Sequence, residues 1–444
     1  MKKILLSFFS LLCFFQGHTQ SVVTTYAGNG TFGFVNGDTA MARFKSPFGI
    51  CMNKNGDLFI ADGGNNCIRK ITATGSVSTL AGTGLAGFAD GPALSSQFNN
   101  PTGVCVDDSG NVYVSDFQNH MIRKISFTGT VTTIAGSGVA GYADGIGAAA
   151  QFNYPRGICR DRKGNLYVGD SWNHRIRKIA TTGSVSTYAG GGSAMGVSSI
   201  GSLLNGQDTA ARFYTPAGVS VDKIGNIYVA DAYNHRIRKI DTNRVVSVIA
   251  GSGAIGVGNG GYSNGPISTA SLNTPTELFS DSAATKIYIG DTFNNRVRLV
   301  TTGSLTLLAG KGIAGYVNGI DTSARFNYAR GVVANSNGSK VFVVDYNNHC
   351  VRKITAGSLT SVIDQRDPNA DLVIFPNPTK DSFNIKELPF GKYELQITDL
   401  TGKILLHNSL ILPSKIDVSS LSKGIYLISV EGENVIKHNK IIID

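Results

Sequence analysis

The feature that most limits the fold of this chain is a short segment that occurs six times. It follows the pattern D-x-x-N-x-x-(I/V)-R, as in "DSWNHRIRKI" at residues 170–179, and successive copies begin 54, 54, 61, 60 and 54 residues apart. The aspartates that open the copies are Asp62, Asp116, Asp170, Asp231, Asp291 and Asp345. A period of this length indicates a repeat architecture, in which copies of one supersecondary unit bury a shared core.

Each unit contains four short apolar runs. The first two form a hairpin pattern such as "PRGICRDRKGNLYVGD", with an Asn-Gly, Ser-Gly or Lys-Gly dipeptide at the turn in several copies. The run "IRKI" predicts a third strand, and a segment such as "SVSTLAG" predicts a fourth after a Thr-Gly turn. Four strands per unit, with no helical periodicity, are typical of β-propeller blades.

The repeated segments also carry the signature of a known family. "DSWNHRIRKI", "DAYNHRIRKI" and "DFQNHMIRKI", each after "GN(L/I/V)YV", resemble NHL repeats, and the resemblance covers roughly residues 22–363. It implies an all-β fold with a six-bladed NHL-type β-propeller. The unpaired run "SVVTTYAG" at 21–28 matches the fourth strand of every blade, so we expect it to close the ring on the last blade. The run at 357–365 would then be redundant or form an added edge.

The composition divides the chain into four regions. Residues 1–20 have two lysines before an apolar run and predict a secretory signal peptide. Residues 21–365 form the propeller, and residues 366–372 a linker. No later stretch has the ~18 apolar residues of a transmembrane segment. The mature protein is therefore expected to be exported, and either secreted or attached to the cell surface.

Residues 373–444 predict a small all-β sandwich, because glycine becomes rare and several alternating runs follow each other. This region resembles the C-terminal (type A) sorting domain of the type IX secretion system, through Pro376-Asn377-Pro378, "DLTGK" at 399–403, "GIYLISV" at 424–430 and the final "KIIID". The resemblance implies a Gram-negative bacterium, passage across the outer membrane, and the type IX machinery as the partner of residues 373–444.

The polar residues of the repeat are interpreted as structural, because a group present in every blade does not mark one active site. Each aspartate is expected to accept backbone N–H groups and to pair with an arginine seven residues later. These arginines are Arg69, Arg123, Arg177, Arg238, Arg298 and Arg352. The asparagines of D-x-x-N, such as Asn173, suit a left-handed turn position. Histidine follows in four copies and is replaced by Asn66 and Asn295 in two, which favours a hydrogen-bonding role over catalysis.

Residues that break the repeat are the candidates for ligand binding. Strand alternation places the D-x-x-N turns and the long glycine-rich connectors on one face. The second x of D-x-x-N is aromatic in three consecutive blades, at Trp172, Tyr233 and Phe293. Beside Arg175 and Arg236, these rings fit a groove for sugar or peptide. The alternative is that the rings pack against their own connectors.

Other motifs give little support for catalysis. Asp90 and Asp144 stand where other connectors carry asparagine, which turn chemistry explains better than calcium binding. Glu277, the only glutamate in residues 21–370, replaces the glycine of a recurring "PxG" and has no second glutamate nearby. The aligned first-strand position holds Cys51, Cys105, Cys159, Ser220, Phe279 and Val333, a poor set of metal ligands. We therefore expect no cofactor, no metal site and no catalytic residue.

The charge distribution bears on the partner. The net charge is +10, and residues 21–370 hold 30 Lys and Arg against 21 acidic residues. An electrostatic partner of the propeller should be anionic, and export argues against nucleic acid. The function expected is non-catalytic binding at the cell surface or outside the cell, with a glycan or protein as ligand. The alternative is a metal-dependent lyase or lactonase-like propeller enzyme.

Overall fold

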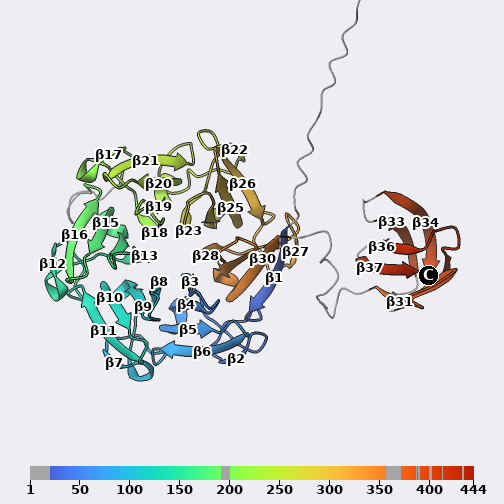
Figure 1. Cartoon of the computed structure of the whole chain (residues 1–444), viewed down its shortest axis with the longest axis horizontal. Coiled ribbons are helices and arrows are strands. Elements are labelled where there is room, and N and C mark those ends of the chain that lie inside the picture. The colour runs from blue at the N-terminus through green and yellow to red at the C-terminus, as the bar shows by residue number, and fades with distance from the viewer. Residues whose placement is uncertain are drawn as a thin grey trace, which may run out of the picture. The chain divides into compact units, whose positions relative to one another are not determined.

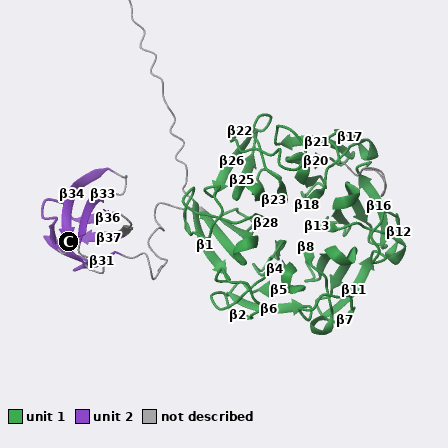
Figure 2. Cartoon of the chain, turned by 180° about the vertical axis from the view of Figure 1, so that it is seen from behind, with its two compact units in different colours: residues 1–356 green, residues 357–444 purple. Residues whose placement is uncertain are grey.

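The computed structural model describes residues 21–191 and 201–356, and residues 372–444 apart from 387, 389–390, 400–402, 413 and 433–434. The chain divides into two compact units, residues 1–356 and residues 357–444 (Figure 2). The predicted signal peptide at 1–20, the run at 357–365 and residues 366–371 of the predicted linker lie outside the described residues.

The first unit contains six antiparallel sheets arranged around a central axis (Figure 1). This confirms the predicted six-bladed propeller. The innermost strands are β3 (Ile50–Met52), β8 (Pro101–Val106), β13 (Pro155–Arg160), β18 (Pro216–Val221), β23 (Pro275–Ser280) and β28 (Ala329–Ala334). Neighbouring innermost strands contact each other around the whole ring, including β28 with β3. We number the blades one to six in this order.

The remaining strands of each blade lie progressively further out. The second strands are β4 (Leu58–Asp62), β9 (Val112–Asp116), β14 (Leu166–Asp170), β19 (Ile227–Asp231), β24 (Ile287–Asp291) and β29 (Lys340–Asp345). The third strands are β5 (Cys67–Ile71), β10 (Met121–Ile125), β15 (Arg175–Ile179), β20 (Arg236–Ile240), β25 (Arg296–Thr301) and β30 (Cys350–Ala356). The fourth strands are β6 (Ser76–Ala81), β11 (Thr130–Ala135), β16 (Ser184–Ala189), β21 (Val245–Ala250), β26 (Ser304–Ala309) and β1 (Ser21–Ala27).

A fifth, outermost strand of two residues completes each sheet, where the sequence predicted four strands. These strands are β2 (Gly37–Asp38), β7 (Gly91–Pro92), β12 (Gly145–Ile146), β17 (Gly206–Gln207), β22 (Gly265–Pro266) and β27 (Gly319–Ile320). Each belongs to the connector that leads into the blade and pairs with its fourth strand. Two residues are too few to show an alternating pattern, so these strands could not be predicted from the sequence.

Strand β1 closes the ring, as predicted. It pairs antiparallel with β30 along residues 21–27, with Val23 opposite Ile354, and on its other side with β27. The last blade is thus built from both ends of the propeller sequence.

The core of the propeller lies between blades rather than within them. Each gap between neighbouring blades holds one cluster of buried apolar side chains. Five of the gaps include a fully buried phenylalanine from the connector, namely Phe44, Phe98, Phe152, Phe213 and Phe326. Truncating such a ring to alanine typically costs about 3–5 kcal/mol, so these rings hold neighbouring blades together.

The helices of the described residues are single 3₁₀ turns. Those that follow the second strands are η1 (Gly63–Asn65), η3 (Phe117–Asn119), η5 (Ser171–Asn173), η7 (Ala232–Asn234), η8 (Thr292–Asn294) and η9 (Tyr346–Asn348). Those within connectors are η2 (Ala93–Ser95), η4 (Gly147–Ala149) and η6 (Asp208–Ala210). None of these helices has the length and apolar character needed to cross a bilayer.

The second unit is a small sandwich of two sheets. One sheet has the order β31 (Val373–Phe375), β32 (Ser382–Lys386) and β35 (Lys415–Asp417). The other has the order β34 (Ile404–Leu412), β33 (Gly391–Thr398), β36 (Gly424–Gly432) and β37 (Val435–Ile443). Both contribute to one buried apolar cluster that includes Phe383, Leu395 and Ile441.

Candidate ligand-binding face

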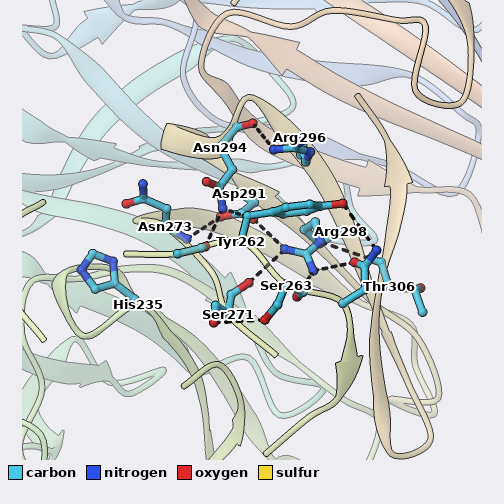
Figure 3. Close-up of polar contacts among 12 residues, drawn as sticks. His235, Tyr262, Ser263, Ser271, Asn273, Asp291, Asn294, Arg296, Arg298 and Thr306 are labelled. Carbon is cyan, nitrogen blue, oxygen red and sulfur yellow. Dashed lines mark hydrogen bonds and ion pairs between the residues drawn. The ribbon is translucent and has the colours of Figure 1, made fainter. Parts of the chain in front are cut away.

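An Asp–Arg ion pair lies at the end of the second strand in every blade. The six Arg Nη1 to Asp Oδ2 distances run from 2.7 to 3.0 Å, and all twelve side chains are fully buried. In blade five, Asp291 also accepts the backbone N–H of Asn273 through Oδ1 (Figure 3). Arg298 donates to the carbonyl oxygens of Ser263 and Ser271 in the connector. The pair therefore fastens the connector to the blade.

Aromatic rings enclose these arginines. The guanidinium of Arg177 lies 5.2 Å from the ring centroid of the buried Phe152 and 5.0 Å from that of Tyr142 in the same connector. Arg69, Arg123 and Arg352 have the same two-ring arrangement. A guanidinium whose terminal nitrogens are bonded to an aspartate and to connector carbonyls, and whose faces are covered by rings, is a structural element.

The structure explains why Asp90 and Asp144 replace asparagine. Arg177 Nη2 donates to Asp144 at 2.6 Å, and Arg123 Nη2 donates to Asp90 at 2.6 Å. In other blades the same nitrogen donates to an asparagine Oδ1, as from Arg69 to Asn36 at 2.8 Å. Both residue types therefore supply one acceptor oxygen to the arginine.

One prediction about the D-x-x-N turn is wrong. The left-handed residue is the one after the asparagine, for example His174 at φ 54° and Asn66 at φ 49°. The asparagine is instead the last residue of the 3₁₀ turn, where its side-chain amide can reach two acceptors. The Asn173 amide donates to Asp170 and to the connector carbonyl of Gly141, both at 2.8 Å.

The left-handed residue joins each blade to the next. The Nδ1 atom of His174 accepts the backbone N–H of Thr215 in blade four at 3.0 Å, and His235 accepts that of Thr274 in blade five at 3.0 Å. Where asparagine replaces histidine, its Oδ1 is the acceptor. Asn66 Oδ1 accepts the backbone N–H of Asn100 at 2.9 Å. The histidine is therefore a hydrogen-bond acceptor between blades; the sequence had predicted a hydrogen-bonding role without its partner.

The predicted aromatic row lies on the connector face, which we define as the end of the propeller that carries the D-x-x-N turns and the connectors. Trp172 is 54% exposed and Phe293 is 41% exposed, whereas Tyr233 is half-buried. Each ring contacts a ring of a connector, at centroid distances of 4.8 Å to Tyr154, 5.3 Å to Tyr214 and 5.4 Å to Tyr328. All three rings thus pack against connector rings, as the alternative interpretation expected, and Trp172 and Phe293 remain exposed to solvent.

The two arginines that were predicted to accompany the row are buried and interact with the connectors. Arg175 is buried, with its guanidinium 3.9 Å from the ring centroid of Tyr142. Arg236 is buried and donates to the carbonyl oxygens of Asn234 and Gly253. A direct contact of either with a ligand remains a prediction.

A group of residues near the propeller axis, at the start of the innermost strands, was missed as a site by the sequence reasoning. The middle residue of "PxG", or of its equivalent, lies near the start of the innermost strand in each blade. At this position blade three has Arg156 and blade six has Arg330. Both guanidiniums lie over the Phe48 ring of blade one, at 5.9 and 4.3 Å from its centroid. The sequence signal that could have revealed this site is that the residue type at this position differs between blades, whereas the rest of the strand pattern repeats.

The ring of glycines beside these arginines is interrupted only by Glu277. A Cβ at Gly49 or Gly103 would lie 2.2 or 2.1 Å from a backbone oxygen of the next blade, so those positions require glycine. The Glu277 carboxyl lies against Gly218, and its Oε1 is buried without a hydrogen-bond partner among the described residues. Burial raises the pKa of Glu277 to about 8, although the charges of Arg156 and Arg330 act to lower it.

The inner strands show no arrangement suited to a metal ion. Within the described residues, no group of three or more His, Cys, Asp or Glu side chains is placed to hold one. Cys51, Cys105 and Cys159 are free thiols, and burial raises the pKa of each.

Family models match both units of the chain. The NHL repeat matches residues 44–71, 98–125 and 152–179, and the teneurin NHL domain matches residues 202–355. The secretion system C-terminal sorting domain matches residues 373–444. The chain therefore carries NHL repeats and a type IX sorting domain, which directs it to the cell surface or the extracellular space.

Curated relatives match the chain over part of their own length. Protein SUPPRESSOR OF QUENCHING 1 of Arabidopsis thaliana is 29% identical over 239 residues, which cover 50% of this chain and 22% of that protein. Human NHL repeat-containing protein 2 is 26% identical over 327 residues, covering 66% of this chain and 44% of that protein. The matched regions thus span less than half of either relative.

Solved structures share the fold. An auxiliary nutrient binding protein from Bacteroides thetaiotaomicron superposes with a TM-score of 0.56 at 18% identity, covering 75% of this chain and 76% of that one. An auxiliary nutrient binding protein from Bacteroides ovatus gives 0.56 at 17% identity, covering 77% and 78%. At this level of identity, the similarity is one of fold.

Proposed function

We propose that this chain, an NHL-repeat propeller with a type IX sorting domain, binds an extracellular ligand on its connector face and does not catalyse a reaction. The ligand class that the face fits best is a glycan, followed by a protein or peptide. Nutrient binding, the role named for two Bacteroides propellers of this fold, belongs to the same class of function.

The exposed apolar side chains of the connector face carry this proposal. Besides Trp172 and Phe293, the connectors present Leu85, Val139 and Ile313 at equivalent positions, each more than half exposed. Exposed apolar groups that recur on one end of a rigid scaffold mark an interaction surface. The flat rings among them suit the apolar faces of sugars.

The test is binding of the purified protein to a panel of neutral and anionic glycans at low and physiological salt. A Trp172→Ala/Tyr233→Ala/Phe293→Ala variant removes the row, and Phe127→Ala is the matched control. Phe127 is 73% exposed in the turn between β10 and β11, on the opposite end of the propeller.

We expect binding that survives physiological salt, is lost in the triple variant and is kept in Phe127→Ala. Binding that disappears with salt would assign it to the basic surface alone, because exposed charges are screened at this ionic strength. An absence of binding to every glycan would contradict the glycan assignment and leave a protein ligand.

A further inference from the structure

Arg156 and Arg330 come from opposite sides of the propeller and meet at its axis. Blades three and six face each other across the ring, and Phe48 belongs to blade one. Side chains from these blades reach one ring only by extending toward the propeller axis. The Arg156 guanidinium also lies 5.4 Å from the Phe117 ring of blade two, and that of Arg330 lies 3.8 Å from the Tyr346 ring.

These two guanidiniums differ from the six arginines of the D-x-x-N pairs in their partners. Each of those six is bonded to an aspartate and to connector carbonyls. Arg156 and Arg330 form no ion pair of 4 Å or less among the described residues, and their Nε atoms are buried without a hydrogen-bond partner, as are those of four of the six motif arginines. Burial lowers the pKa of both, and Arg156 helps to lower that of Arg330 to about 10. Two cations therefore oppose each other without a bound counter-charge.

Glu277 does not supply that counter-charge at neutral pH. It forms no ion pair of 4 Å or less with either arginine among the described residues, and its buried Oε1 is unpartnered. With a pKa of about 8, its carboxyl is largely protonated at pH 7. A protonated carboxyl is a hydrogen-bond donor, so Glu277, Arg156 and Arg330 all have donors to offer.

We propose that the axial end of the innermost strands binds the oxyanion of an acidic sugar between Arg156 and Arg330, with the sugar ring lying against the surrounding aromatic rings. The inference rests on the proposed glycan-binding function and names the ligand class and the position of its charged group. A carboxylate and a sulfate ester share the required chemistry, because both accept the fork of donors that a guanidinium presents. Phe117 and Tyr346, which are half-buried, provide the flat apolar surfaces beside it.

The experiment compares charged and neutral forms of the same glycan by calorimetry on the purified full chain. The probes are an oligogalacturonate and its methyl ester, and a sulfated oligosaccharide and its desulfated form. Arg156→Met and Arg330→Met keep most of the side-chain stem over the rings and remove the charge. Arg162→Met is the matched control, because Arg162 is exposed in the β13–β14 turn on the opposite end.

We expect the protein to bind at least one charged probe about 10- to 100-fold more tightly than its neutral form, the effect of a hydrogen-bonded charge. Each axial variant should lose this preference and keep its affinity for the neutral form, and Arg162→Met should keep both. The pair that shows the preference identifies the group as carboxylate or sulfate ester.

Two results would overturn the proposal, and they are distinguishable from failure of the binding function. Equal affinity for charged and neutral probes would contradict the anion site while glycan binding stands. A charge preference that both axial variants retain would place the anion elsewhere. If no oligosaccharide binds, galacturonate and inorganic sulfate are titrated alone. Binding of either, lost in both variants, would support the axial site without the glycan function, and no binding would reject both.

A pH series adds a readout that a purely structural role would not change. As Glu277 ionises above pH 8, its charge offsets that of the arginines, so affinity for the charged probe should fall between pH 7 and pH 9. Glu277→Gln should abolish the fall. The groups around Glu277 are Arg156 and Arg330 and the thiol of Cys159, whose pKa is raised well above this range. A fall that persists in Glu277→Gln would exclude this residue as its cause.

Discussion

At the scale of single residues, the two acidic groups that bond one arginine are not equivalent. Asp170 is fully buried and accepts from Arg177, Asn173 and the backbone of Asn153, whereas the Asp144 side chain is 49% exposed and faces the same arginine from the connector. Replacing Asp170 by asparagine turns an acceptor into an amide donor that faces two other donors. The same change at Asp144 reproduces the asparagine of other blades.

We therefore predict that Asp170→Asn lowers the free energy of unfolding by about 3–5 kcal/mol, the usual cost of breaking a buried ion pair on one side. Asp144→Asn should change it by less than about 1 kcal/mol, as expected for a partly exposed pair. Chemical denaturation of both variants, monitored by circular dichroism, measures the difference. Equal destabilisation by the two changes would mean that the exposed carboxylate is needed as a charge.

At the scale of elements, the histidine after each 3₁₀ turn links two blades through an uncharged acceptor. His235 is buried, with Nδ1 accepting from Thr274 and Nε2 bonded to the carbonyl of Gly256 at 2.7 Å. Burial is the main cause that lowers its pKa from the ordinary value. Protonation of Nδ1 would set a donor against the N–H of Thr274, so the link requires the neutral ring.

The pH dependence of stability follows from this lowered pKa. Between the folded and unfolded pKa values of His235, the unfolded chain binds more protons, so stability rises with pH. The contribution is complete above the unfolded value of about 6.5 and is lost as pH falls through the folded value. His235→Asn keeps an acceptor that does not titrate in this range. The stability gap between the wild type and this variant should therefore shrink as pH falls from 7 to 5.

His235→Leu is the control for the hydrogen bond itself. It leaves the buried N–H of Thr274 without a partner and should cost about 1–3 kcal/mol at pH 7. His235→Asn should cost less, because Asn66 and Asn295 perform the same role in blades one and five. A gap between the wild type and His235→Asn that is independent of pH would contradict the assignment of the titrating group.

The elements also show how far sequence reasoning reaches. Sequence reasoning could predict the four main strands, the D-x-x-N turns and the Asp–Arg pairing. Each occurs in six copies, and comparison of the copies shows which positions stay constant. The left-handed position was misassigned by one residue, because His174 and Asn173 both tolerate turn conformations and only the contacts of the Asn173 amide distinguish them. The axial site was missed because Arg156 and Arg330 lie 174 residues apart and meet only once the ring is closed.

At the scale of the whole molecule, the propeller depends on one strand that joins its two ends. Strand β1 contributes the fully buried Val23 and Ala27 and pairs with β30 along its length. Without β1, the edge of β30 would lose its backbone partners, and buried side chains of blade six would meet water. Blade six also positions Arg330, so closure of the ring and formation of the axial site are linked.

We predict that a chain beginning at Gly28 unfolds at a temperature about 5–10 °C lower than one beginning at Ser21, since the lost strand costs several kcal/mol and each kcal/mol shifts the midpoint by about 2 °C in a large domain. A synthetic peptide of residues 21–27 should restore the midpoint in a concentration-dependent manner, because an added strand can complete an open sheet edge. The same peptide with Val23→Asp is the matched control and should not restore it. An unchanged midpoint in the shortened chain would show that another segment closes blade six.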